Sequence, residues 1–388
     1  MQTRNRTHLR TAGRIIKAVK TSPERIVFSL LLTGFSLTSH ADHLSGGFGI
    51  GDSGPIMTES ALPLEGGKWN VGIKSEFVEN KDLSDARLIT LRGTGIDRDG
   101  EPDEDLHNID SIFGVSLNAS YGLTDDITVG LRLPYVKRNN IHEPEEGHAH
   151  DGNPIVIHNI IDHGDSAGIG DLTLFGFYRF YNADDHHASI LLGLKTPTGE
   201  TDKTGFKNEY AAGLYQTQVI PDGDHDHHDG TVLETHQQPG SGSWDGSVGL
   251  AYSYHPGNIN FDSSILYTLV TEGAQRTDLG DVVSYNLAVS RPTTRLAPCD
   301  FCSWDLILEL NGERRARETR DGVEVGNSGG HILYLSPGLR LNFGNGLNLS
   351  ASFGYPVVRD LNGDQSEPDY RFVGAVNYGL RPWLPLKL

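Results

Sequence analysis

The sequence predicts an all-β protein: a single transmembrane antiparallel β-barrel of about 12 strands, with short periplasmic turns and long extracellular loops. Three observations support this fold. Apolar and polar residues alternate from Lys68 onward, without apolar residues at helical spacing. Long and short connections alternate between the predicted strands. Aromatic residues gather near both ends of the strands.

The N-terminus predicts an export signal. Residues 1–25 carry seven basic residues and one acid, residues 26–37 are mostly apolar, and Ser39-His40-Ala41 supplies the small residues of a cleavage site. The apolar run is too short to cross a bilayer as a helix. We therefore expect a cleaved signal peptide at 1–41 and a Gram-negative outer membrane location.

The predicted strands follow in order along the rest of the chain. In Phe113, Val115 and Leu117, for example, the apolar positions are separated by glycine and serine. The twelve predicted strands are 68–79, 109–121, 126–138, 169–181, 187–197, 243–254, 259–271, 280–291, 302–312, 330–343, 347–357 and 370–382. An even number of strands places both ends of the barrel domain, 68–388, on the periplasmic side.

A secreted β-sandwich would show the same alternation, so periodicity alone does not decide between the two folds. Aromatic placement favours the barrel, because amphipathic rings collect at the level of the lipid headgroups. One band includes Trp69, Tyr178 and Tyr252, and the other includes Tyr135 and Tyr267.

Charge and cysteine content exclude several classes of protein. The chain has 32 Lys and Arg against 51 Asp and Glu, a net charge of −19. Removing residues 1–41, which carry +6, leaves −19 − 6 = −25, and such a chain repels nucleic acid. Two cysteines exclude a disulfide-dense scaffold. Cys299 and Cys302 fall in a predicted periplasmic turn, where an oxidising compartment favours a local disulfide.

Several short motifs carry a resemblance to a known family. The run GPIMTESA at 54–61 precedes GGKW at 66–69, and GIGDLTL at 168–174 precedes YRF at 178–180 and LKTPTGE at 194–200. These motifs resemble a family of predicted outer-membrane proteins named for the meta pathway of phenol degradation. The resemblance implies an outer-membrane transporter or channel, often encoded near genes for aromatic catabolism or metal handling.

The chain departs from that family in two places. Residues 198–242 form a longer, acidic, histidine-containing loop, predicted to be extracellular. The chain ends in Leu388, whereas similar proteins usually end in an aromatic residue that the barrel-assembly machinery reads. We expect that machinery and the lipid bilayer, including anionic outer-leaflet lipids, to be its partners.

The lumen is the first candidate functional site. The predicted inward face carries seven bases and five acids: Lys74, Arg132, Arg179, Lys195, Arg340, Arg371 and Arg381, and Glu76, Asp245, Asp262, Asp305 and Glu309. Such charges can form a selective constriction, or they can pair and hold the barrel shut. Residues 42–67 are predicted to be either a periplasmic leader or a plug of the lumen.

Histidines in the long loops are the second candidate. His225, His227 and His228 alternate with aspartates at 222–229, and imidazole and carboxylate groups suit zinc, copper or nickel. A solvated acidic loop has the same composition, so this is a weak prediction of a loop-bound divalent metal. No other cofactor is required.

The sequence carries no convincing enzyme motif. Ser53 lies in GDSGP, as in trypsin-like proteases, but such a serine follows the triad His and Asp and lies deep in a double barrel, whereas Ser53 lies only about ten residues into the predicted mature chain. The sequence therefore predicts a channel or transporter for a small solute, either an aromatic or hydrophobic compound or a transition-metal species. The alternative is a structural or surface-interaction barrel with a closed lumen.

Overall fold

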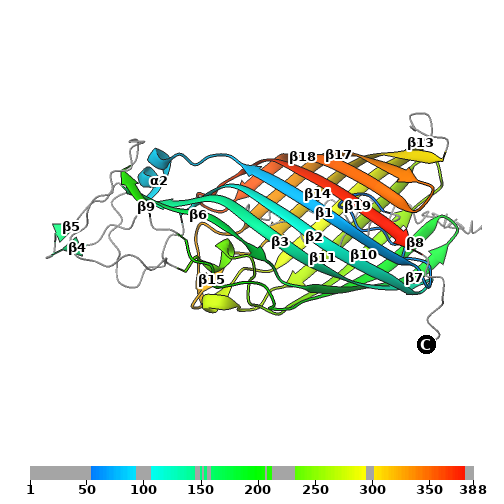
Figure 1. Cartoon of the computed structure of the whole chain (residues 1–388), viewed down its shortest axis with the longest axis horizontal. Coiled ribbons are helices and arrows are strands. Elements are labelled where there is room, and N and C mark those ends of the chain that lie inside the picture. Colours follow the sequence, from blue (N-terminus) through cyan, green and yellow to red (C-terminus); the bar gives the residue numbers. More distant parts are fainter. Residues whose placement is uncertain are drawn as a thin grey trace, which may run out of the picture. The chain divides into compact units, whose positions relative to one another are not determined.

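The computed structural model describes residues 54–92, 106–144, 149–150, 153–154, 159–205, 208–211, 232–293 and 301–380, all within one compact unit. Twelve of its strands form a closed antiparallel barrel, as the sequence predicts (Figure 1). Those strands are β1 (Trp69–Asn80), β2 (Asn108–Thr124), β3 (Ile127–Pro144), β7 (Thr173–Ala183), β8 (His186–Lys195), β10 (Asp245–Tyr254), β11 (Asn260–Leu269), β13 (Val282–Thr293), β14 (Cys302–Arg315), β17 (Gly330–Phe343), β18 (Leu347–Leu361) and β19 (Pro368–Leu380).

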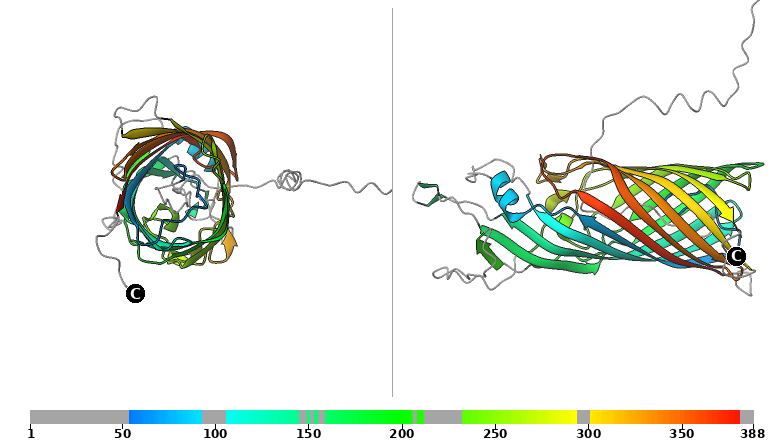
Figure 2. Two further views of the ribbon diagram at one scale, coloured as in Figure 1. Left: turned by 90° about the vertical axis from the view of Figure 1, so that its right-hand side faces the viewer. Right: turned by 90° about the horizontal axis from the view of Figure 1, so that it is seen from above.

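The ring closes where the first strand pairs with the last. β1 pairs with β19 from Trp69 opposite Leu380 to Asn80 opposite Pro368, and its other edge pairs with β2. Looking along the barrel, Figure 2 shows the complete ring with chain inside it. Since every strand has two neighbours, the barrel leaves no open edge to bind another chain.

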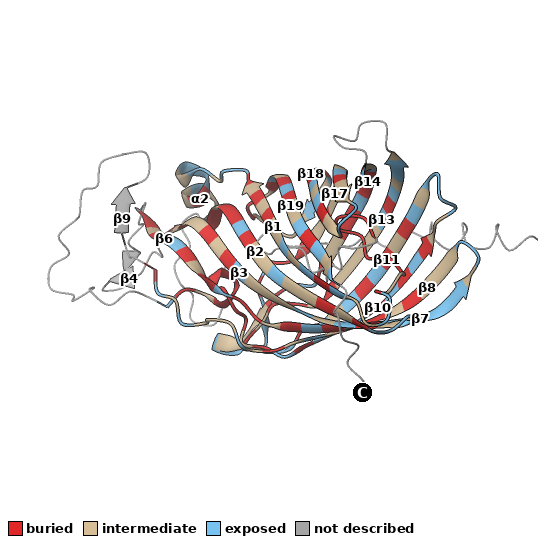
Figure 3. Cartoon of the chain, turned by 45° about the vertical axis from the view of Figure 1, so that its right-hand side comes forward, coloured by how far each residue is buried: buried red, intermediate tan, exposed pale blue. Residues whose placement is uncertain are grey.

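The outer face of the ring is apolar. Ile73, Leu117, Leu250 and Leu308 each expose half or more of their surface, although they lie in the middle of regular strands. Figure 3 shows exposed and buried positions alternating along the strands, as the period of two requires. This is the surface of a barrel whose outside faces lipid and whose polar groups face inward.

Exposed aromatic side chains lie toward both ends of this apolar face. One set lies near the end with the short turns and the other near the end with the long connections. The short-turn set includes Trp69, Tyr178, Phe180, Tyr252 and Tyr378, and the long-loop set includes Phe113, Tyr135, Trp244, Tyr267 and Tyr355. Aromatic side chains at both ends of an apolar face are typical of a barrel in a bilayer, where the rings lie at the two headgroup levels.

Smaller elements gather mostly at the long-loop end (Figure 1). They are α2 (Asp85–Arg92), β4 (Ala149–His150), β5 (Asn153–Pro154), β6 (Asn159–Ile169), β9 (Asn208–Ala211), the 3-10 turns η1 (Thr235–Gln237) and η2 (Ala274–Arg276), β12 (Thr277–Asp278), β15 (Thr319–Arg320) and β16 (Val323–Glu324). The described residues contain no helix long and apolar enough to cross a membrane.

One predicted strand begins in the wrong place. The prediction began at 169, but the regular strand β7 begins at Thr173, and 159–169 form the separate strand β6. β3 pairs with β6 along one half and with β7 along the other. Between the two strands the chain passes close to Pro134 and Pro239 at Gly170, where a Cβ would lie 3.0 Å from both, and the next residue, Asp171, is buried inside the barrel.

A charge on the outer face tests this arrangement. We expect Leu250→Arg, at the middle of β10, to destabilise the protein in lipid vesicles by about 2–4 kcal/mol, because the charge would lie in hydrocarbon. The measurement is urea unfolding followed by tryptophan fluorescence. Leu250→Ala controls for loss of the side chain, and equal unfolding curves for the arginine and alanine variants would contradict the lipid-facing assignment.

Candidate functional site

The candidate site is the lumen of the barrel. The structure buries or brings together inside the ring nine of the twelve charged residues that the sequence predicts there: Lys74, Glu76, Arg132, Lys195, Asp245, Asp262, Glu309, Arg340 and Arg371. Their alternation with outward apolar residues explains this placement. What the sequence could not supply is how these charges pair and what else occupies the lumen.

Residues 54–64 lie inside the barrel, and we call them the lumen segment. Backbone N–H groups of Met57 and Thr58 donate to the carboxylate of Glu309 on β14, at 3.0 and 2.9 Å. Arg340 on β17 donates from Nη2 to the carbonyl oxygens of Gly54 and Pro55. Both side chains are buried, so these charge-assisted bonds fix the start of the segment against one wall.

The lumen segment then crosses to the opposite wall. Ser189 Oγ on β8 donates to the carbonyl oxygen of Ala61 at 2.6 Å, and the Ala61 N–H donates to Ser253 Oγ on β10 at 2.8 Å. The Leu64 N–H donates to Thr128 Oγ1 on β3 at 2.8 Å. Side chains of the barrel thus satisfy the backbone of a segment that has no regular structure of its own.

Apolar packing holds the same segment. Ala61 is buried against a cluster formed by Phe175, Phe177, Leu191, Ala251 and Leu266. Ile56 and Met57 pack with Ile307 and Val373. These wall residues point inward, so this part of the lumen is filled by side chains and inserted chain.

A second segment, residues 232–243, lies in the lumen toward the long-loop end, and we call it the folded-in loop. Asp171 anchors this loop. Its carboxylate accepts hydrogen bonds from the Gly199 N–H at 2.8 Å, and from the N–H and Oγ of Ser241 at 2.8 and 2.7 Å. The backbones approach closely here, since a Cβ on Gly199 would lie 2.7 Å from the Gly170 and Gly240 backbones. Glycine is therefore required at this contact.

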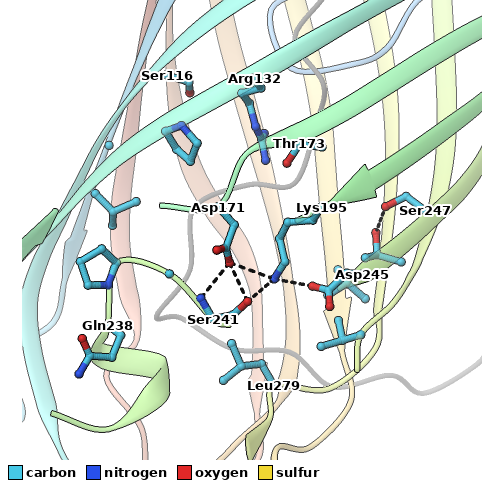
Figure 4. A pocket seen from close by; sticks show the side chains of 18 of the residues that line it. Ser116, Arg132, Asp171, Thr173, Lys195, Gln238, Ser241, Asp245, Ser247 and Leu279 are labelled. Carbon is cyan, nitrogen blue, oxygen red and sulfur yellow. Dashed lines mark hydrogen bonds and ion pairs between the residues drawn. The ribbon is translucent and has the colours of Figure 1, made fainter. Parts of the chain in front are cut away.

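Lys195 connects this anchor to the barrel wall. Its Nζ lies 2.5 Å from Asp245 on β10 and 3.6 Å from Asp171, and it donates to Ser241 Oγ at 2.6 Å (Figure 4). One lysine thus joins two buried carboxylates and a serine. The motif GIGD at 168–171 and the motif TPTGE at 196–200 meet at this network.

Glu200 ends the second motif at the rim of the barrel. It accepts a hydrogen bond from the side chain of Lys203 and another from the Ile169 N–H at 3.1 Å. These two bonds, the lysine bond being the stronger cause, hold the pKa of the Glu200 carboxyl below its ordinary value. Glu200 therefore stays ionised and ties the connection after β8 to the end of β6.

A chamber of about 210 Å³ lies in the lumen, and residues 238–241 of the folded-in loop form part of its lining (Figure 4). Its lining includes five cationic side chains, Lys74, Arg132, Arg138, Lys195 and Arg315, and four carboxylates, Glu76, Asp171, Asp245 and Glu313. Apolar residues of β13 and of the connection between β11 and β13 line another part. The chamber can hold a small organic molecule, since an engineered cavity of about 150 Å³ binds benzene.

Beneath the chamber the lumen narrows. A second cavity of about 20 Å³ lies between the lumen segment and β1, β17, β18 and β19, and Lys74 lines both cavities. A cavity of this size holds about one water molecule. Residues 55–59 of the lumen segment form one side of this second cavity.

The remaining predicted residues lie elsewhere. Arg179 lies at the short-turn end, where its guanidinium is 2.7 Å from the Asp126 carboxylate. Asp305, also toward that end, accepts a hydrogen bond from Asn342 at 2.8 Å. Cys302 is disulfide-bonded. Arg381, Cys299 and the histidines His225, His227 and His228 lie outside the described residues.

Among the described residues, no group of three or more His, Cys, Asp and Glu side chains could hold a metal ion.

Ser253, Asp262 and His255 lie together as the members of a catalytic triad would. However, Asp262 is in the middle, bonded to the serine at 2.5 Å and to the imidazole at 3.0 Å. A nucleophilic serine needs the histidine as its neighbour, so this cluster lacks the geometry of a hydrolase.

Sequence reasoning missed Arg138, Asp171, Glu313 and Arg315 as lumen residues. β14 runs three residues beyond its predicted end, which brings Glu313 and Arg315 inside. Asp171 was visible only as part of a motif. The available signal was the position of this acid, which directly follows Gly170 and precedes a strand, in a motif that is paired with TPTGE at 196–200.

Comparison with known proteins gives structural similarity only. No family model and no curated protein matches the chain. An outer membrane channel from Pseudomonas putida F1 has a TM-score of 0.48 at 13% identity, covering 82% of this chain and 98% of that one. A toluene transporter from Ralstonia pickettii has a TM-score of 0.41 at 11% identity, covering 90% and 99%. These similarities do not assign a solute.

The anchor at Asp171 can be tested by its effect on the folded-in loop. We expect Asp171→Asn to speed hydrogen exchange of the Ser241 and Gly199 amides at least tenfold, since the amide cannot accept all three bonds and loses the charge. Exchange is followed by mass spectrometry in detergent. Asp165→Asn, the same change at a half-exposed ion pair with Lys137, is the control. Unchanged exchange at Ser241 would contradict the anchoring role.

Proposed function

We propose that the protein is an outer-membrane channel that admits a small solute to the central chamber and releases it when an inserted segment moves. The observation that carries the proposal is the chamber itself: a charged cavity of about 210 Å³ in the lumen, lined in part by the folded-in loop. A barrel that serves only as a scaffold has no need of a polar cavity, because its own side chains can fill the lumen.

The hydrogen bonds that hold the lumen segment and the folded-in loop in place are of a kind that allows either segment to be displaced. The lumen segment is held by a buried glutamate, an arginine and serine hydroxyls, and the folded-in loop by a buried aspartate. Most of these contacts are hydrogen bonds to backbone groups, which water can replace when a segment leaves the lumen. Neither segment is part of a strand, so displacement leaves the barrel intact.

The membrane assignment rests on the outside of the barrel. The exposed apolar face and its aromatic bands fit a bilayer, and the N-terminal pattern at 1–41 fits export by a cleaved signal. The short-turn end then faces the periplasm, where Cys302 would be bonded to Cys299. The acidic loops face outward, beside anionic lipids.

Two solute classes are supported by different features. An aromatic or other hydrophobic compound follows from the family resemblance and from the apolar part of the chamber lining. A transition-metal species follows from the histidines at 225–228. A closed structural barrel is the alternative function, favoured by the packing of Ala61 among Phe175, Phe177 and Leu191.

Releasing the lumen segment should open the channel. We expect Glu309→Gln to raise the open probability of single channels in planar bilayers about tenfold, because glutamine keeps only one acceptor oxygen and loses the charge that strengthens the bonds from the Met57 and Thr58 N–H groups. Glu324→Gln, a change at an exposed position on β16, should leave the conductance unchanged. If neither the wild-type protein nor Glu309→Gln conducts, the lumen is closed and the structural alternative holds.

The metal hypothesis has its own test. If the outer loops bind metal, micromolar zinc should reduce the conductance of the mature protein, and replacing His225, His227 and His228 with asparagine should abolish this effect. Replacing His186, a histidine at the short-turn end, is the control. Identical zinc responses in the wild type and the triple variant would remove the loop from the mechanism.

A further inference from the structure

The two walls of the chamber differ in chemistry. Lys74 on β1 and Arg132 and Arg138 on β3 supply one wall. Another is supplied by Val270 and Leu279, in the connection that follows β11, and by Val282 at the start of β13. β1 and β11 are six strands apart in either direction around the ring, so these walls face each other across the lumen. A molecule in the chamber touches cations on one side and methyl groups on the other.

Ion pairs within the protein account for most of the chamber's other charges. Lys195 lies within 4 Å of both Asp171 and Asp245. Arg315 lies 3.3 Å from Glu313, and Arg371 lies 3.8 Å from Glu76. Within the described part of the chain, Lys74 has no carboxylate within 4 Å, although Glu76 and Glu59 are near enough to attract it.

The apolar wall presents three hydrocarbon side chains, with Thr268 and Ser284 beside them. Val270, Leu279 and Val282 form a cluster of buried side chains. The Val270 N–H donates to Asp281 Oδ1 at 2.9 Å, so its polar backbone group is already satisfied. A polar ligand gains nothing from these three side chains, whereas an apolar group that reaches them leaves water.

We propose that the chamber binds a small organic anion with a single carboxylate at one end and an apolar body, such as a ring or a short branched chain, at the other. The carboxylate lies toward Lys74, and the body lies against Val270, Leu279 and Val282. This inference names the substrate class of the proposed channel, so entry of the ligand rests on that function, but binding itself does not.

The same walls discriminate against other ligands. An organic cation of this size would meet Lys74 and Arg132, and an uncharged analogue would leave the lysine without a new partner. A small anion without an apolar body would pair with Lys74 but would leave the hydrocarbon wall in contact with water. Both ends of the ligand are therefore required for tight binding.

The test is isothermal titration calorimetry of the mature protein in detergent, with benzoate as the probe. Benzyl alcohol, benzylammonium and acetate are the comparison ligands. We expect benzoate to bind at least tenfold more tightly than any of these. Comparable binding of benzyl alcohol or acetate, or no binding of benzoate, would overturn the proposal, and this series needs no variant to fold.

Variants then locate the anion. Lys74→Gln should weaken benzoate binding about tenfold, while Lys74→Arg, which keeps the charge, should restore it. Lys81→Gln removes the same charge from an exposed ion pair with Glu367 and should have no effect. Equal benzoate affinity in Lys74→Gln and the wild type would overturn the assignment of Lys74.

The experiments distinguish an error in the proposed ligand class from an error in the proposed channel function. Single-channel recording of the same preparations reports conduction, whereas calorimetry reports occupancy. A protein that binds benzoate but never conducts would contradict the proposed function and keep the ligand class. A protein that conducts but binds benzoate no better than benzyl alcohol would keep the channel and contradict the ligand class.

Discussion

The pairing of β1 with β19 is the constraint on which the rest of the structure depends. Once the first and last strands share hydrogen bonds from Trp69 to Asn80, the barrel has an inside that is cut off from lipid. The apolar residues of each strand are then committed to the outer face, and the charged residues are committed to the lumen. The ion pairs and the inserted segments described above all lie in that enclosed, polar space.

The protein uses one device twice to organise the enclosed space. In both cases a buried carboxylate accepts hydrogen bonds from backbone N–H groups that lie outside the strands. Glu309 binds the backbone of Met57 and Thr58, and Asp171 binds the backbone of Gly199 and Ser241. Such charge-assisted bonds are strong while water is excluded and weaker when water enters. They suit segments that must be held in place and also released.

The sequence predicts the barrel well, because a period of two is a local property. All twelve strands are confirmed, and the alternation that defines them also places Lys74, Glu309 and Arg340 on the inner face. The predicted start of one strand at 169 was wrong, because β6 ends there and β7 begins only at Thr173, with the buried Asp171 between them. Which charge pairs with which, and that residues 54–64 lie in the lumen, depend on contacts between different elements, some of them more than 200 positions apart, such as Met57 and Glu309. No local pattern contains that information.

The central claim is that the lumen segment occupies the solute's route and must leave it. The most direct measurement is conductance of a protein with cysteines at Ala61 and Ser189, whose contact is 2.6 Å between the Ala61 carbonyl oxygen and Ser189 Oγ. The account predicts that oxidation of this pair abolishes single-channel openings and that reduction restores them, while the wild type treated in the same way conducts throughout. Openings of unchanged size and frequency in the oxidised variant would contradict the account.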